Sequence, residues 1–303
     1  MNEKGVKDML FGIDLGAHSV KVFSNNTKDK FLSKISEEKG YLEDFNVNFN
    51  DHIIQVGEGE FSTDWNKADK SNTLPLLFTA LYRYSDKSFN KVVIGLPANQ
   101  YKSHKDSLRQ FILNNAVQIV NNKEIFIEDC IVECEGISAY NALDKSIKDR
   151  IGSQQLIIVD IGGRTTDICC IKNKRILSVN TIPTGTLNAY SKIVDYVNAE
   201  YTVNLPLEEG KAIIDTEAYC IKGHAIDRMF VKDILRNTFN SIFKELQLKY
   251  SLDSGYVLLV GGGSYIFQKT FKKRLGNIIT VPDAEYLNAI GFYKRGVSTW
   301  LRK

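Results

Sequence analysis

The sequence contains few cysteines, and their arrangement does not predict a disulfide framework. Its five cysteines are an odd number, and no second Cys or His pair completes a four-ligand metal site with Cys130 and Cys134. Cys169 and Cys170 are adjacent, so on a strand their side chains point to opposite faces. We therefore predict that these four cysteines and Cys220 are small buried apolar residues.

Long apolar runs and an excess of charge of one sign are also absent. No run approaches the ~18 apolar residues that a membrane span needs, and the opening MNEKGVKDML lacks the apolar core of a secretory signal. The 39 Lys and Arg residues against 36 Asp and Glu residues leave a net charge of +3. That balance is too weak for the concentrated basic surface of a nucleic-acid-binding protein. We expect a cytoplasmic protein with no membrane association and no direct contact with nucleic acid.

The length and composition are typical of a folded α/β protein of about two domains. The chain has 303 residues, of which 43% are hydrophobic and 25% charged. Apolar segments that run into glycine or proline predict buried strands, namely MLFGIDLG, KVVIGLP, QQLIIVDIGG and GYVLLVGGG. Residues 106–120, 136–147 and 227–248 have helical periodicity. The polar segment 23–72 predicts a less regular excursion from the main sheet.

One short pattern occurs twice in the chain. IDLGAHSVKV at residues 13–22 aligns without gaps with VDIGGRTTDI at residues 159–168. The alignment matches small, basic, hydroxyl and charged positions: Asp14 with Asp160, Gly16 with Gly162, Ala17 with Gly163, His18 with Arg164, Ser19 with Thr165, Val20 with Thr166, and Lys21 with Asp167. Each segment predicts a strand, a glycine-containing turn and a second strand that pairs back as a hairpin. The repeat indicates two halves of related design.

The turns of these hairpins have the composition of a phosphate site. Glycine lets backbone N–H groups approach an anion closely, and the hydroxyls of Ser19, Thr165 and Thr166 add donors. One such hairpin is weak evidence, because turn acids and turn glycines are common. Two copies favour a phosphate site, although the GxxxxGK[ST] and GxGxxG patterns are both absent.

The acids of the two hairpins need a partner if phosphate binds beside them. A carboxylate next to a triphosphate is repelled unless a cation intervenes, so Asp14 and Asp160 are candidates to hold Mg²⁺, largely through its water shell. Lys21 offers countercharge to the phosphates.

A third glycine cluster follows the strand YVLLV. Gly261, Gly262 and Gly263 stand between this strand and the helical segment that begins SYIFQKTF. Such a turn can pass a flat base or a phosphate close to its backbone. A tight packing turn is the alternative.

In this order, GIDLGAHSVK, DIGGRTTD and VGGGS resemble the two phosphate motifs and the adenosine motif of the actin, Hsp70 and sugar-kinase superfamily. Residues 133–143 (ECEGISAYNAL) and 283–296 (DAEYLNAIGFYKRG) resemble its two connecting helices. Within the superfamily, VVIGLP followed by Asn-Gln-Tyr, the short length and DIGGRTTD look like the ParM-type bacterial plasmid-segregation actins and their archaeal relatives.

The resemblance implies an actin-like fold of two related ribonuclease-H-like domains around a nucleotide cleft, each with a smaller inserted subdomain. On this basis residues 1–140 plus 285–303 form domain I, with its smaller subdomain at about 24–75. Residues 141–284 form domain II, with its smaller subdomain at about 186–248.

The resemblance also implies roles for individual residues. Asp14 and Asp160 correspond to the acids near Mg²⁺, and Lys21 to the lysine on the phosphates. Glu135 corresponds to the group that positions or activates the attacking water, with a solvated helix-cap acid as the alternative. The implied nucleotide-binding residues are Gly16, Ala17, His18, Ser19, Gly162, Gly163, Arg164, Thr165, Thr166, Asp167, Gly261, Gly262 and Gly263.

A base pocket is less clearly marked in the sequence. Glu208 and Lys211 lie where the superfamily places a helix against the ribose and adenine, but a solvated charged helix face is an equal alternative.

The function implied by the resemblance is an ATPase that hydrolyses ATP to ADP and phosphate as it polymerises into filaments. Such filaments move plasmid DNA through a DNA-binding adaptor at a centromere-like site. The nucleotide, ATP or GTP, would bind with Mg²⁺. A sugar or acid kinase of the same superfamily stays open, although no Asp-centred sugar motif occurs near residues 85–110.

Overall fold

The computed structural model of the chain describes residues 9–38, 46–64, 66–86 and 89–301, which contain both helices and strands. The strands are β1 Met9–Leu15, β2 Ser19–Phe23, β3 Lys28–Leu32, β4 Lys34–Ser36, β5 Asn46–Phe49, β6 His52–Val56, β7 Glu60–Phe61, β8 Phe89–Leu96, β9 Val117–Val120, β10 Lys123–Cys134, β11 Gln155–Ile161, β12 Thr166–Lys172, β13 Arg175–Ile182, β14 Cys220–Ile221, β15 His224–Ala225, β16 Gly255–Val260 and β17 Ile278–Ile279. The helices are α1 Thr73–Tyr84, α2 Ala98–Asn114, α3 Ile137–Ala142, α4 Lys145–Ile151, α5 Thr186–Tyr201, α6 Glu209–Asp215, α7 Met229–Lys249, α8 Gly263–Arg274 and α9 Leu287–Gly296, with shorter turns η2 Lys67–Asp69, η3 Ala284–Tyr286 and η4 Val297–Leu301. The predicted α/β class is confirmed.

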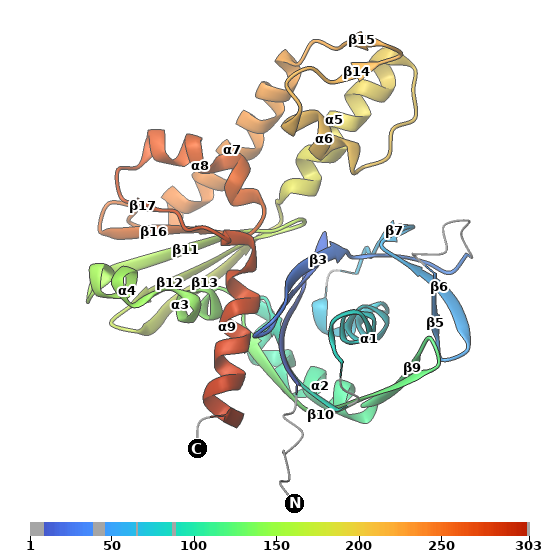
Figure 1. Cartoon of the computed structure of the whole chain (residues 1–303). Coiled ribbons are helices and arrows are strands. Elements are labelled where there is room, and N and C mark those ends of the chain that lie inside the picture. The colour runs from blue at the N-terminus through green and yellow to red at the C-terminus, as the bar shows by residue number, and fades with distance from the viewer. Residues whose placement is uncertain (1–8, 39–45, 65, 87–88, 302–303) are drawn as a thin grey trace, which may run out of the picture.

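The strands form two main sheets that lie on either side of α9 (Figure 1). The larger sheet has ten strands in the order β3-β2-β1-β8-β10-β9-β5-β6-β4-β7. The smaller sheet has five strands in the order β13-β12-β11-β16-β17. In each sheet the central strands are apolar on both faces, as the near-continuous apolar runs predict.

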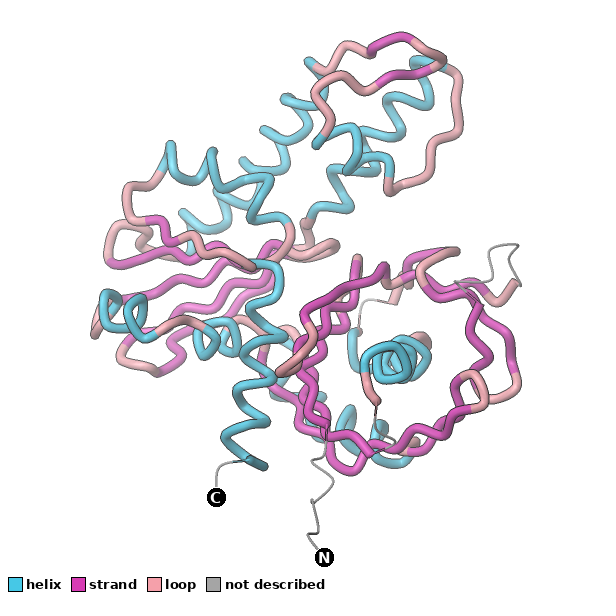
Figure 2. Tube along the Cα trace, in the orientation of Figure 1, coloured by secondary structure: helices cyan, strands magenta, loops and turns pink. Residues whose placement is uncertain are grey.

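The ten-stranded sheet curls around α1 (Figure 2). Strand β3 lies at one end of the strand order and β4 near the other, yet only Ser33 separates them in the chain. The sheet therefore almost closes on itself. Leu77, Phe78 and Leu81 of α1 are fully buried inside it.

The segment predicted as an excursion from the main sheet belongs to that sheet, so this prediction is wrong. Strand β10 pairs with β9, and β9 pairs in turn with β5 at Val120 and Phe49. Val47 and Val56 share one apolar core with Phe11 of β1. Part of the segment, residues 39–45 and 65, lies outside the described residues.

The five-stranded sheet has a separate apolar core on each face. Helices α7 and α8 cover one face, with Phe239 and Phe271 in the core, and α3 and α4 cover the other. Cys170 lies in the first core and Cys169 in the second, so the predicted opposite orientation is confirmed. All five cysteines are free, but Cys220 is exposed because it lies on the small β14–β15 hairpin, so its predicted burial is wrong.

An outlying unit sits above the five-stranded sheet (top of Figure 1). Its own apolar cluster joins α5, α6, the β14–β15 hairpin and the beginning of α7. The later part of α7 packs on the sheet through Phe243 and Leu246. Helix α7 therefore belongs partly to the outlying unit and partly to the main one, and the division at 186–248 stays a prediction, as do the boundaries of both domains.

Helices α3 and α9 cross with their backbones in close contact. A Cβ on Gly291 of α9 would lie 1.9 Å from the Ser138 carbonyl oxygen of α3. Helix α9 also approaches β1 closely, since a Cβ on Gly12 would lie 2.1 Å from the Ala289 carbonyl oxygen. Only glycine permits these approaches. The two segments predicted as connecting helices thus meet between the two sheets.

Two helix boundaries differ from the prediction. The predicted helix over 136–147 is broken between α3 and α4, and Val117–Val120 is strand β9 rather than the end of a helix. Successive residues of β9 alternate between exposed and buried, which is the period of a strand.

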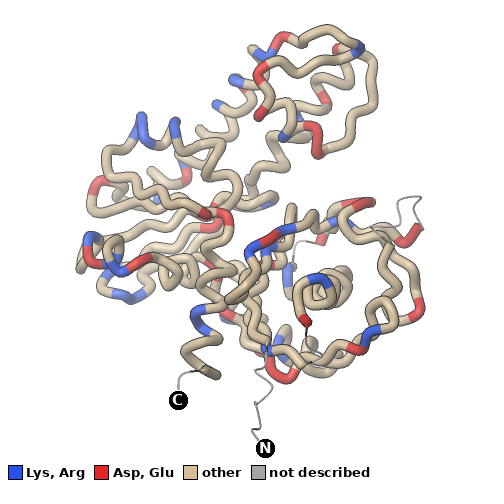
Figure 3. Tube along the Cα trace, in the orientation of Figure 1, with Lys and Arg blue, Asp and Glu red and all other residues tan. Residues whose placement is uncertain are grey.

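None of the helices in the described ranges is long and apolar enough to cross a bilayer. Charged residues of both signs are spread over the parts of the chain around both main sheets (Figure 3), in keeping with the net charge of +3.

Candidate functional site

The two repeated segments form equivalent hairpins. In the β1–β2 hairpin, Asp14 pairs with Lys21, and in the β11–β12 hairpin Asp160 pairs with Asp167. Each first strand ends in its acid and one further apolar residue, after which glycine begins the turn. The prediction of two hairpins is confirmed.

The turns of the two hairpins face each other across a cavity between the sheets. A Cβ on Gly163 would lie 2.8 Å from His18 Cβ and 3.2 Å from His18 N. The cavity has a volume of about 780 Å³. Most of the residues predicted for the site line it: Asp14, Gly16, Ala17, His18, Ser19, Lys21, Glu135, Asp160, Gly162, Gly163, Arg164, Thr165, Asp167, Lys211, Gly261, Gly262 and Gly263.

Two of the predicted residues do not line the cavity. Thr166 is buried within β12, where its hydroxyl donates to the Thr184 carbonyl oxygen at 2.8 Å. Glu208, at the start of α6, forms a salt bridge with Lys34 of β4 and so joins α6 to the ten-stranded sheet. Lys211, one turn further along, does reach the cavity.

The third glycine turn combines close packing with an open surface. Gly261 has a φ of +79°, and a Cβ there would lie 2.4 Å from Asp160 Oδ1. A Cβ on Gly263 would lie 2.3 Å from Ile161 Cγ2. The backbone at Gly262 is open, with no atom within 4 Å of a Cβ at that position. Two glycines of this turn therefore pack on the second hairpin, as the packing alternative predicts, and the middle one lies on the cavity wall. The approach of a base or phosphate to this turn stays a prediction.

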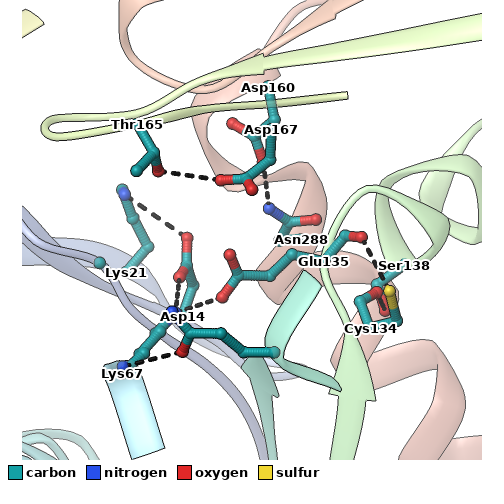
Figure 4. A network of polar contacts seen from close by, with 12 residues as sticks. Asp14, Lys21, Lys67, Cys134, Glu135, Ser138, Asp160, Thr165, Asp167 and Asn288 are labelled. Atoms are coloured by element: carbon teal, nitrogen blue, oxygen red, sulfur yellow. Dashed lines mark hydrogen bonds and ion pairs between the residues drawn. The ribbon is translucent and has the colours of Figure 1, made fainter. Parts of the chain in front are cut away.

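Four buried carboxylates gather at the inner end of the cavity (Figure 4): Asp14, Glu135, Asp160 and Asp167. Asp160 Oδ2 accepts a hydrogen bond from Asn288 Nδ2 at 2.6 Å, and Asn288 Oδ1 accepts one from Gly136 N at 3.0 Å. Asn288 therefore links the second hairpin, α9 and the start of α3. The sequence analysis missed it because an isolated Asn in a helical segment has no local signature.

Asp167 is held by two hydroxyl groups. It accepts hydrogen bonds from Thr165 Oγ1 at 2.9 Å and from Thr181 Oγ1 at 2.5 Å. The Thr165 hydroxyl is thus engaged within its own hairpin.

Among the residues that the structure describes, two lysines form ion pairs with these carboxylates, and only Lys21 was predicted. Lys21 Nζ lies 3.4 Å from Asp14 Oδ2. Lys67 Nζ lies 3.3 Å from Asp14 Oδ1 and also pairs with Glu135 Oε1. Lys67 belongs to η2, in a charged stretch whose local sequence is typical of solvent-exposed side chains.

The environment of each carboxylate changes its pKa. Burial raises the pKa of Asp160 to about 7, and the charges of Glu135 and Asp14 act in the same direction. Burial also raises the pKa of Glu135, although Lys67 opposes it. Burial would raise the pKa of Asp14 as well, but the ammonium groups of Lys21 and Lys67 lower it below its usual value. Perturbed acids gathered in a cavity are typical of a functional site.

The carboxylates fit a hydrated magnesium ion rather than a fully coordinated metal. Within the described ranges, no three carboxylate, imidazole or thiolate groups are placed to hold a metal ion between them. Mg²⁺ commonly keeps several waters and uses one or two carboxylates with substrate phosphates. Asp14 and Asp160, on facing hairpins, provide hard oxygen donors of this kind.

Polar contacts beside the cavity connect the part of the chain built on the ten-stranded sheet with the part built on the five-stranded sheet. Arg164 Nη1, in the second turn, donates to the carbonyl oxygens of Ser62 and Asp64 at 3.0 Å each. With the Lys34–Glu208 salt bridge, these contacts hold the two sides together.

His18 lies in the first turn between aromatic rings. Its ring centroid is 5.4 Å from that of Phe61 and 6.0 Å from that of Tyr190. Burial and the charges of Lys21 and Lys30 lower the pKa of His18 to about 4. The imidazole is therefore neutral at pH 7.

Two sheets that enclose a cavity, one Asp-Gly hairpin from each sheet, a glycine turn and two crossing helices define an actin-like protein. The chain belongs to the actin-like superfamily. Residues 12–137 match the family model of the actin like proteins N-terminal domain, and residues 158–273 match that of the archaeal actin homologue MreB-like C-terminal domain.

Solved structures share this fold over almost their whole length. The chain is similar to the subunit of a 15-stranded ParM filament from Clostridium botulinum, with a TM-score of 0.83, 19% identity and coverage of 96% of this chain and 99% of that one. The non-polymerisable quadruple mutant of pCBH ParM gives a TM-score of 0.80 at 20% identity, with 96% and 100% covered. The archaeal actin homolog Ta0583 in complex with ADP gives 0.77 at 17% identity, with 96% and 99% covered. No curated protein sequence matches the chain. The predicted actin-like fold is confirmed.

Proposed function

We propose that this chain is a cytoplasmic, filament-forming ATPase that binds ATP with Mg²⁺ in the cavity between its two sheets. The observation that carries the proposal is the approach of the two equivalent turns at Gly163 and His18, directly beside the four buried carboxylates. A triphosphate between the turns would meet backbone N–H groups from both units. Its binding would therefore favour the closed arrangement of the two sides.

The phosphate end of the site would use both hairpins. Ser19 and the backbone of the two turns would be the donors, joined by the Thr165 hydroxyl once it turns from Asp167 to the phosphate, and Lys21 would supply positive charge. Asp14 and Asp160 would hold Mg²⁺ through its waters. When bound, Mg²⁺ would neutralise the charge that develops on the phosphates during transfer.

Glu135 is the proposed group that acts on the attacking water. It follows β10 directly, lines the cavity and precedes α3. Its burial keeps the carboxylate from serving as a solvated helix cap, which was the alternative. A carboxylate at this point can orient a water and accept its proton.

The base would lie toward the outlying unit. Ile214, Leu235 and Ile266 line that end of the cavity together with Lys211 and the open backbone of Gly262. Flat apolar walls suit a purine ring. We propose ATP as the nucleotide, with GTP as the comparator to be measured.

Self-assembly is proposed from the nature of the relatives. One similar structure is a ParM filament, and another is a ParM mutant described as non-polymerisable. A repeated head-to-tail contact between identical subunits produces such filaments. We propose further that the filament segregates plasmid DNA through a DNA-binding adaptor, because a net charge of +3 suits an indirect role at DNA better than a direct one.

The test is sedimentation of the purified chain with Mg²⁺ and ATP, ADP, GTP or no nucleotide, followed by negative-stain imaging of the pellets. We expect filaments with ATP, fewer with ADP and none without nucleotide. The same samples are assayed for phosphate release and, with a panel of sugars and small acids, for ADP release. Substrate-dependent ADP release without assembly would replace this proposal by the kinase alternative.

A further inference from the structure

Lys67 is the most enclosed positive charge that contacts the acids of the cavity. Its side chain is 10% exposed and lies between Asp14, at 3.3 Å, and Glu135 (Figure 4). The three residues come from η2, from β1 and from the end of β10, so they meet only in the folded chain. No role for Lys67 follows from the proposed hydrolysis.

The structure fixes Lys67 in this position. Its backbone N–H donates to Gln100 Oε1 of α2 at 2.9 Å. Asn66 caps η2, since its side chain accepts a hydrogen bond from the N–H of Ala68 at 3.1 Å. Arg164 of the opposite unit binds the preceding loop through two carbonyl oxygens. These contacts therefore hold the segment that carries Lys67, so that its ammonium group lies against the two carboxylates.

The buried carboxyl groups around Lys67 outnumber the lysines that pair with them. Asp14, Glu135, Asp160 and Asp167 are all buried, and among the described residues only Lys67 and Lys21 form ion pairs with any of them. Removal of one member of a buried ion pair leaves an uncompensated charge, which strongly destabilises a protein. The site therefore needs a cation at this point whether or not a metal ion is bound.

We propose that Lys67 is a counter-ion built into the chain, which neutralises Asp14 and Glu135 while the cleft holds no divalent cation and yields Asp14 to hydrated Mg²⁺ when Mg²⁺ and nucleotide bind. The inference rests on the proposed use of Mg²⁺ in this cleft. The contact with Asp14, at 3.3 Å, is at the long end of the hydrogen-bonding range, so Asp14 is the partner that is exchanged. Lys67 then remains paired with Glu135.

The experiment measures the melting temperature of the nucleotide-free full chain against Mg²⁺ concentration at constant ionic strength. Lys67→Met keeps the length of the side chain and removes its charge. We expect it to lower the melting temperature by roughly 5–15 °C without Mg²⁺. Millimolar Mg²⁺ should recover at least half of this loss, because the divalent cation can now occupy the place of the ammonium group. The wild type should respond little.

Lys70→Met is the matched control. Lys70 lines the same cavity, three residues further along. Among the described residues it forms no ion pair with Asp14 or Glu135, which act on its charge only at longer range. It should show the small Mg²⁺ response of the wild type. An equal Mg²⁺ response in Lys67→Met and Lys70→Met would overturn the proposal, because the effect would then follow from total charge alone.

The double variant Lys67→Met with Glu135→Gln tests the charge balance directly. It removes one cation and one carboxylate, so it should regain stability over Lys67→Met and lose the enhanced Mg²⁺ response. If the double variant is as unstable as Lys67→Met, or unfolded like it, Lys67 acts through packing and the proposal fails. If Lys67→Met does not fold, a folded double variant supports the proposal.

The proposed function is tested separately by binding of a fluorescent ATP analogue to the wild type. A wild type that binds no nucleotide would reject the proposed function, while the Mg²⁺ response of the nucleotide-free Lys67→Met chain would still decide the role of Lys67.

Discussion

Gly163 lies against His18, so that the turn of the second hairpin touches the turn of the first across the cleft. A side chain on Gly163 would place its Cβ 2.8 Å from His18 Cβ. Only the His18 side chain separates the backbones of the two turns at this point. Their separation determines the width of the proposed phosphate site.

We predict that Gly163→Ala weakens binding of Mg²⁺ and ATP by at least about tenfold, because the added methyl group forces the two turns apart. Binding is measured with a fluorescent ATP analogue. Gly276→Ala is the control, since a Cβ at Gly276 meets no atom within 4 Å. The prediction fails if the two variants bind nucleotide equally well.

Asp160→Ala should reduce ATP hydrolysis by about 10²-fold or more, because the hydrated Mg²⁺ loses one of its anchors. Asn288 also loses the acceptor of its 2.6 Å hydrogen bond. Phosphate release is measured under saturating ATP, and thermal melting verifies that the variant is folded. Asp253→Ala, which removes an exposed acid, is the control. Wild-type turnover in folded Asp160→Ala would reject the second hairpin as a phosphate site.

The affinity for Mg²⁺ and ATP should rise with pH through about 7. Burial and the neighbouring acids Glu135, Asp14 and Asp167 raise the pKa of Asp160 to about 7, so below this pH its carboxyl group is protonated and a poor partner for Mg²⁺. The ionised fraction changes about tenfold between pH 6 and pH 8, and the dissociation constant should fall by a similar factor.

The same raised pKa of Asp160 makes the stability of the folded chain without Mg²⁺ decrease as the pH rises. Between its usual pKa and 7, Asp160 keeps in the folded state a proton that it loses in the unfolded state, so its contribution to stability falls as pH rises. Asp160→Asn should remove both dependences. Calorimetric binding titrations from pH 6 to pH 8, and thermal melting without Mg²⁺ from about pH 4 to pH 7, compare the two chains. The difference between them isolates the Asp160 carboxyl group from the titration of the nucleotide and of Glu135.

Glu135→Ala should separate assembly from hydrolysis. The variant should bind ATP and assemble, because the hairpins and Asp160 are intact, while phosphate release slows and filaments persist longer. Paired phosphate-release and light-scattering traces make the comparison with wild type. Glu135→Gln, which keeps the shape of the side chain, should behave in the same way. Unchanged hydrolysis, or loss of ATP binding, would reject the proposed role of Glu135.

The local features of the fold could be predicted because each is encoded within a short stretch of chain. An apolar strand, an acid and a glycine turn lie within a few residues of one another in both hairpins, and their periodicity is that of the structure that forms. The two faces of β12 follow from alternation alone, which is why Cys169 and Cys170 were placed correctly. Helix limits were less accurate. Residues 117–120 form strand β9, which is fixed by pairing with β10 and with the distant β5.

The amino-acid sequence by itself therefore determined the hairpins, the glycine turn and the superfamily. Tertiary structure decided which charges meet. Lys67 and Asn288 carry no local signature, yet they reach Asp14, Glu135 and Asp160 from segments far apart in the chain. Glu208 was expected near the ribose but pairs with Lys34 across the cleft mouth. The physical reason is that burial of a charged side chain is costly unless a partner of opposite charge is buried with it. That partner comes from a distant segment and is in place only when the two sheets close together.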